Sequence, residues 1–113
     1  MINRLEEIRA LFADWHHDAI GKISEKTIDF VKSVLIDVMS KNIDVPSIFP
    51  MLNCGVSIEW TIGDWEISVD FNDELTMFFA LNTNTDEDIC TYLENPSISD
   101  VSDEIIKFFA SVT

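Results

Sequence analysis

The sequence predicts an α+β domain, because the spacing of its apolar residues changes along the chain. Near both ends apolar residues recur at helical spacing, whereas in the middle they alternate with polar residues as on a half-buried strand. The length of 113 residues suits one domain. We therefore expect a single domain over residues 1–113, with a helical hairpin (1–42), an antiparallel β-meander of three to four strands (54–93) and a C-terminal helix (98–112).

The helical hairpin is predicted from two apolar stripes. The first helix ends near residue 20, and its stripe consists of Ile2, Leu5, Ile8, Leu11 or Phe12, and Trp15. Gly21 is a suitable helix end, and Ser24 is a suitable N-cap for a second helix over about 24–41. The stripe of the second helix consists of Ile28, Val31, Leu35, Val38 and Met39.

Two strands joined by a tight turn are predicted at the start of the meander. The apolar residues that alternate with polar ones are Val56, Ile58 and Trp60, then Ile67, Val69 and Phe71. Gly63 and Asp64 suit a two-residue turn with glycine first. This turn pairs Trp60 with Ile67, so every apolar residue of both strands lies on one face.

A third strand and a fourth segment complete the predicted meander. A turn at residues 72–74 pairs Phe71 with Leu75 in the third strand. This register places Met77, Phe79 and Leu81 on the apolar face. The same alternation sends Phe78 to the opposite face. Residues 89–93 fit either a fourth strand or a short helical turn, and their alternation favours the strand.

Two further segments flank the meander. Before it, Pro46 and Pro50 predict an extended connector over residues 44–50, because proline has no amide N–H and disfavours helix in the residue before it. After it, Ser97 or Ser99 caps the last helix. The apolar face of that helix consists of Val101, Ile105, Phe108 and Val112.

The charge of the chain is strongly negative and unevenly distributed. Twenty-one acidic residues against seven basic ones give a net charge of −14 at neutral pH. No Lys or Arg occurs between Lys41 and Lys107, so nearly all of the negative charge comes from the second part of the chain. This field opposes binding to phosphate backbones and to anionic membrane surfaces, so we expect neither a nucleic acid nor a membrane as partner.

Acidic residues gather on the polar face of the predicted meander. Glu59, Glu66 and Asp70 lie on the strands, and Asp64, Asp73 and Glu74 lie at the turns. These six carboxylates have no counter-ion on the predicted face, and they repel one another. Two interpretations stay open: the face is solvated and aids solubility, or it is a docking surface for a basic partner. An exposed Phe78 would be an apolar anchor on this face, unless a second helix layer covers it.

Catalytic and metal-binding patterns are weak. His16 and His17 are adjacent on a predicted helix, so their side chains point about 100° apart and do not face one metal ion. Cys54 and Cys90 are 36 positions apart, and we expect two reduced, packed thiols. Three glycines are too few for a phosphate-cradling loop. We expect no enzyme, no metal site and no cofactor.

The amino-terminal residues point to the cytoplasm. Glu6 and Glu7 occur where a secretory signal would have a basic start followed by an apolar stretch. No run approaches the roughly 18 consecutive apolar residues that a membrane span needs. We therefore expect a cytoplasmic protein.

Part of the meander resembles a pattern in small bacterial proteins. Residues 54–60 (CGVSIEW) and 63–69 (GDWEISV), followed by Asp73, are similar to a glycine-led strand that ends in Glu-Trp and continues through a hairpin. With the acidity and the α+β layout, the chain resembles at class level the immunity proteins of contact-dependent growth inhibition and other polymorphic toxin systems. The resemblance implies a cytosolic protein that binds and blocks the toxic domain delivered by a sibling cell, commonly a nuclease.

The sequence thus predicts an immunity protein whose interface with a basic toxin domain lies within residues 59–88. A monomer is favoured, but the sequence leaves the oligomeric state open. The candidate partner-binding residues are Glu59, Asp64, Glu66, Asp70, Asp73, Glu74, Phe78, Asp86, Glu87 and Asp88. One alternative is an antitoxin-like adaptor that self-associates through the helical hairpin. Another is a small hydrolase that uses Cys54 or the acidic cluster.

Overall fold

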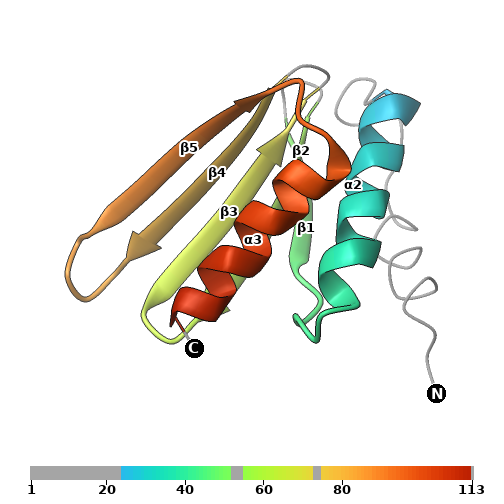
Figure 1. Cartoon of the computed structure of the whole chain (residues 1–113). Helices are drawn as coiled ribbons and strands as arrows, with labels where there is room; N and C mark the ends of the chain where they lie inside the picture. Colours follow the sequence, from blue (N-terminus) through green and yellow to red (C-terminus); the bar gives the residue numbers. More distant parts are fainter. Residues whose placement is uncertain (1–23, 52–54, 73–74, 113) are drawn as a thin grey trace.

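Five antiparallel strands and two helices make up the part of the chain that the computed structural model describes, residues 24–51, 55–72 and 75–112. In chain order the elements are α2 (Glu25–Met39), β1 (Ser47–Pro50), β2 (Val56–Ile62), β3 (Trp65–Phe71), β4 (Leu75–Asn82), β5 (Asp88–Glu94) and α3 (Ile98–Val112). Each strand pairs with the next, and both helices lie against the same side of the sheet (Figure 1). The α+β class is confirmed, whereas the predicted helix over residues 1–20 lies outside the described residues.

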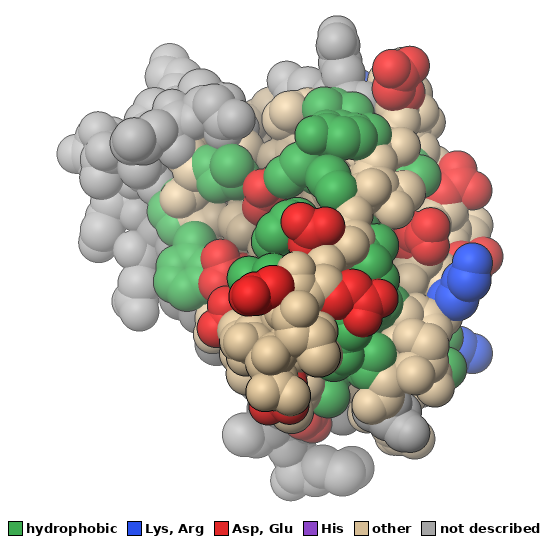
Figure 2. Space-filling view, turned by 90° about the vertical axis from the view of Figure 1, so that its left-hand side faces the viewer, with side chains coloured by type: hydrophobic (Ala, Val, Ile, Leu, Met, Phe, Trp, Pro, Cys, Tyr) green, Lys and Arg blue, Asp and Glu red, His purple; other side chains and the backbone are tan. Residues whose placement is uncertain are grey.

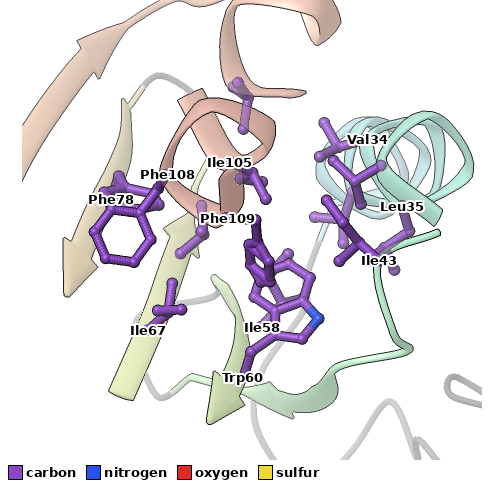
Figure 3. Packing of buried hydrophobic residues seen from close by; sticks show 14 of the residues in the cluster. Val34, Leu35, Ile43, Ile58, Trp60, Ile67, Phe78, Ile105, Phe108 and Phe109 are labelled. Carbon is purple, nitrogen blue, oxygen red and sulfur yellow. The ribbon is translucent and has the colours of Figure 1, made fainter. Parts of the chain in front are cut away.

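The core lies between the two helices and one face of the sheet. Its fully buried side chains include Leu35 and Met39 from α2, Ile58, Ile67 and Phe71 from the sheet, and Ile105 from α3. Aromatic rings join the layers: Trp60 meets Phe109 at a centroid distance of 5.2 Å, edge to face. Figure 3 shows these two rings beside Ile58.

Local capping explains where both helices begin. The Oγ of Ser24 accepts a hydrogen bond from Thr27 N at 3.1 Å, which confirms the predicted N-cap of α2. At α3, the Oγ of Ser97 accepts from Asp100 N at 3.1 Å, and Asp100 Oδ2 accepts from Ser97 N at 3.0 Å. This reciprocal arrangement is a capping box, so Ser97 and not Ser99 caps the last helix.

The β2–β3 hairpin has the predicted register. Trp60 lies opposite Ile67, and the turn between the strands contains Gly63 and Asp64. Gly63 has a φ of 57°, in the left-handed region that glycine adopts without strain. The apolar residues of both strands therefore share the core face, as the alternation predicts.

The register between β3 and β4 differs from the predicted one by one residue. Asn72 N donates to Leu75 O at 3.0 Å, and Leu75 N donates to Asn72 Oδ1 at 2.7 Å. The ladder therefore includes this pair, and Phe71 lies opposite Thr76 instead of Leu75. Because side chains alternate along a strand, a shift of one residue exchanges the two faces of β4.

The prediction that Phe78 lies on the polar face of the meander is therefore wrong. Its side chain is only 4% exposed and packs against Phe108 of α3 at a ring distance of 5.4 Å (Figure 3). On the core face of β4 lie Thr76, Phe78 and Ala80, and on the other face lie Met77, Phe79 and Leu81. The core therefore contains the residues of β4 that the predicted register assigns to the polar side.

The connector predicted over residues 44–50 contains an additional strand, β1, that the sequence pattern does not predict. Residues Ser47–Pro50 pair with β2 at one edge of the sheet, where Pro50 lies opposite Val56. A proline is compatible with an edge strand because the outer edge needs no N–H donor. At the other edge, β5 confirms the strand predicted over residues 89–93. The sheet thus has five strands instead of three to four.

Replacing Ser102 with alanine is expected to stabilise the protein. Ser102 lies fully buried in α3, and its hydroxyl has no hydrogen-bond partner in the described part of the structure. An unpaired buried hydroxyl costs roughly 1–3 kcal/mol, so Ser102→Ala should raise the free energy of unfolding by about 1 kcal/mol. Urea unfolding followed by circular dichroism measures this change. A loss of stability would instead indicate that the hydroxyl has a partner.

Candidate protein-binding face of the sheet

One side of β3, β4 and β5 faces away from α2 and α3, and we call it the open face. Among the described residues, no helix covers it (Figure 1). Its side chains, read from the strand register, are Glu66, Ser68 and Asp70 from β3, Leu75, Met77, Phe79 and Leu81 from β4, and Asp88, Cys90, Tyr92 and Glu94 from β5. From β2, Glu59 and Thr61 extend it beyond Ser68 and Glu66.

The middle of the open face is apolar. Met77, Phe79 and Leu81 occur at every second position of β4 and are all partly exposed. Phe79 lies between Ser68 of β3 and Cys90 of β5, so small side chains flank its ring. Beside this strip, Tyr92 of β5 is 63% exposed. These residues form an apolar surface of the kind found at the centre of protein interfaces.

Carboxylates surround the apolar strip. At one end Leu81 lies between Glu66 and Asp88, and Met77 has Asp70 beside it on β3. Glu94 marks the far end of β5. None of the strand segments contains Lys or Arg, because the chain has no base between Lys41 and Lys107. The open face therefore combines apolar side chains with a negative electrostatic field.

The surface around β5 shows the same combination. Figure 2, which looks at the molecule from the β5 side, shows red carboxylates between green apolar side chains and blue lysine atoms only towards the right margin. Next to the strip, a shallow hollow of ≈ 240 Å³ is lined mainly by Glu59, Thr61, Glu66, Ser68 and Phe79. A basic side chain entering this hollow would meet two carboxylates and an aromatic ring.

The predicted site residues fall into four groups. Glu59, Glu66 and Asp70 lie together on the open face, and Asp88 joins them from β5. At the adjoining turns, the exposed residues are Asp64, Asp86 and Glu87. Asp73 and Glu74 lie outside the described residues. Phe78 is in the core, so it is not an anchor on this face.

Sequence reasoning missed the apolar residues of the open face. Phe79 and its neighbours at alternate positions of β4 are assigned to the core by the predicted register. The signal that would correct this is Asn72, a residue that commonly hydrogen-bonds to the backbone a few residues further along the chain. Tyr92 carries no motif, and its exposure depends on β5 being an edge strand.

The pKa of Tyr92 is expected to lie above its ordinary value. A hydrogen bond with the Cys90 side chain and the charge of that group raise this pKa, because both lie on one face of β5. Since Tyr92 is the only tyrosine, absorbance at 295 nm reports its ionisation alone. The midpoint should exceed about 10 in the folded protein, and Cys90→Ala should return it to about 10. The urea-unfolded chain provides the control, and an unchanged midpoint in Cys90→Ala would contradict the contact.

The described residues offer binding chemistry more clearly than catalytic chemistry. Within them, no group of three or more His, Cys, Asp or Glu residues could hold a metal ion. Cys90 is exposed on β5, whereas Cys54 and both histidines lie outside the described part. What the open face supplies is therefore apolar area, negative charge and the hydroxyl of Tyr92, which can donate a hydrogen bond.

Comparison with known proteins gives no match: no protein-family model, no curated protein and no solved structure matches this chain. Neither of the two described helices is long and apolar enough to cross a membrane.

Proposed function

We propose that this protein is an immunity protein of the cytoplasm that binds and neutralises a basic toxin domain through its open face. The observation that carries the proposal is the apolar strip of Met77, Phe79 and Leu81 with carboxylates around it and no base on any strand. A nuclease is the favoured toxin, because an enzyme that holds a polyanion has a basic active cleft.

The two parts of the open face have different roles in this proposal. The carboxylates attract a basic surface and raise the rate of association, which charge complementarity can change by about 10- to 1000-fold. Charge alone would leave a complex that dissociates in salt. The apolar strip and Tyr92 provide desolvated contacts, and such contacts carry most of the binding energy in protein interfaces.

A face that serves only solubility would have a different composition. Solubility favours interspersed charges of both signs and few exposed aromatic residues. The open face instead has charges of one sign around Phe79, and Tyr92 is 63% exposed. Like charges on neighbouring strands also cost stability, so the arrangement favours a surface selected for a partner.

Affinity capture from a lysate of the source cell tests the proposal. The tagged protein is washed at low salt and at roughly 0.5 M salt, where exposed charges are screened, and the retained proteins are identified by mass. We expect one basic toxin-like protein that survives the wash, degrades nucleic acid, and loses this activity when an equimolar amount of the protein is added. Retention of this chain alone, or a captured protein whose activity is unaffected, would contradict the proposal and favour a self-associating adaptor.

A further inference from the structure

Strand β5 is an edge of the sheet, and its outer backbone groups are available for pairing. It is the last strand in the order β1-β2-β3-β4-β5, and no described segment pairs with its outer side. The seven residues Asp88–Glu94 pair with β4 without a bulge, and all of them are at least partly exposed. This edge is therefore long, regular and accessible.

The ladder fixes which backbone groups point outwards. Asn82 N donates to Glu87 O at 2.8 Å, so these two residues form a hydrogen-bonded pair. In an antiparallel ladder, pairs that exchange hydrogen bonds alternate with pairs whose N–H and C=O groups point away. Counting from Glu87, the outward-pointing residues of β5 are Asp88, Cys90, Tyr92 and Glu94. Their side chains also lie on the open face.

The β5 edge lacks the features that usually prevent strand addition. Proteins protect sheet edges with proline, lysine, bulges or very short strands. Strand β1, at the other edge, has only four residues, follows Pro46 and ends in Pro50. Strand β5 contains neither proline nor lysine. Its only charges are the carboxylates of Asp88 at one end and Glu94 at the other.

These two charges select the strand that can pair with β5. In antiparallel pairing of two copies centred on Thr91, Asp88 of each copy would lie opposite Glu94 of the other. Acid would then face acid at both ends, which is unfavourable. A strand with Lys or Arg at positions six residues apart would place an opposite charge at each end. Between them, alternate apolar residues would lie beside Cys90 and Tyr92.

From this geometry we propose that the protein partner adds an extended basic strand to the outer edge of β5 and becomes a sixth strand of the sheet. Backbone hydrogen bonds to Cys90 and Tyr92 hold the strand, and Asp88 and Glu94 fix its register. The added strand extends the apolar strip beyond Tyr92. This inference rests on the proposed binding of a basic protein, and it names the segment of the partner that binds.

A designed peptide tests the proposal without the natural partner. The probe is acetyl-Lys-Thr-Val-Thr-Val-Thr-Lys-amide, which matches the spacing of Asp88 and Glu94. Amide hydrogen exchange of the isotope-labelled protein is measured by NMR. When the peptide is at about ten times its dissociation constant, exchange at Cys90 and Tyr92 should slow about tenfold. The inward amides of Ile89 and Thr91 should change much less, since the ladder with β4 already protects them.

Two controls separate strand addition from general charge attraction. The same peptide with both lysines replaced by glutamate should give no protection. In the protein, Cys90→Pro removes one outward N–H and should weaken binding at least about tenfold, whereas Cys90→Val keeps this N–H and should bind as before. If Cys90→Pro does not fold, the two peptides on the unchanged protein still decide the result.

Three outcomes would overturn the inference: no slowing with the lysine peptide, equal slowing with the glutamate peptide, or slowing that rises with protein concentration alone. The last would show that β5 pairs with a second copy. Failure of the peptide together with capture of an inhibited toxin would overturn strand addition and leave the proposed function standing. Protection by the peptide without any captured toxin would support strand addition and contradict the toxin assignment.

Discussion

Phe78→Ala is expected to lower the free energy of unfolding by about 3–5 kcal/mol, whereas Phe79→Ala should cost only about 1 kcal/mol. The Phe78 ring is 4% exposed and contacts Phe108, so its removal leaves a cavity between β4 and α3. The Phe79 ring is partly exposed on the other face, and its removal leaves no enclosed space. Urea unfolding of both variants measures the difference.

The two phenylalanines are matched controls for each other because they are adjacent in one strand and have the same side chain. Equal losses, or a larger loss for Phe79→Ala, would mean that β4 pairs one residue away from the register in the structure. The slope of the unfolding free energy against urea should stay similar, since both variants expose nearly the same surface on unfolding. Partner binding should show the opposite order, with Phe79→Ala the more damaging variant.

The failed prediction of the third strand shows how much depends on a turn. Alternation correctly groups the residues of β2 and β3, because the two-residue turn at Gly63 and Asp64 has a recognisable composition. At the next turn, the sequence places Asn72 in the loop, whereas in the structure it pairs with Leu75 through backbone and side chain. Alternation shows which residues of a strand share a face. The length of the preceding turn decides whether that face is the core face or the opposite face of the sheet.

Strand β1 shows a second limit of sequence reasoning. Pro46 and Pro50 correctly indicate extended backbone, but they argue against a strand inside a sheet. The objection does not apply to an edge, where Ser47–Pro50 pairs with β2 on one side only. The contacts that hold this part of the chain are distant in sequence: besides the ladder with β2, Trp60 Nε1 donates to Asp44 O at 2.7 Å, just before β1. No local pattern contains that information.

The candidate site was predictable in its charges and not in its apolar part. Glu59, Glu66 and Asp70 share a face because they alternate with core residues in a hairpin of known register. The apolar residues around Phe79 join them only through the register of β4. The apolar strip beside the carboxylates distinguishes a docking surface from a solvated acidic face. That strip follows from the register between β3 and β4, which the sequence alone misassigns.

Reversing two charges on the open face is expected to slow partner association without unfolding the protein. Glu66 and Asp70 lie on β3, beside the apolar strip, and neither belongs to the core. In the double variant Glu66→Lys/Asp70→Lys, the association rate constant for the captured toxin should fall about 10- to 100-fold at low salt. Stopped-flow or surface-based kinetics measures this change, and circular dichroism checks the fold.

A matched control variant separates the effect of where the charges lie from the effect of the net charge on the association rate. The double variant Asp29→Lys/Asp103→Lys changes the net charge of −14 by the same four units, but both residues are exposed on the helix layer. Its association rate should fall much less, because steering depends on where the field is directed. At roughly 0.5 M salt the two variants should associate at similar rates, since exposed charges are then screened.

Rates of dissociation separate the role of the carboxylates from that of the apolar strip. If exposed charges mainly guide the encounter, Glu66→Lys/Asp70→Lys should change the association rate more than the dissociation rate, whereas Phe79→Ala should act mainly on dissociation. Equal slowing of association by both charge variants would mean that only the total charge matters. The open face would then not be the docking surface, whatever the affinity of the complex.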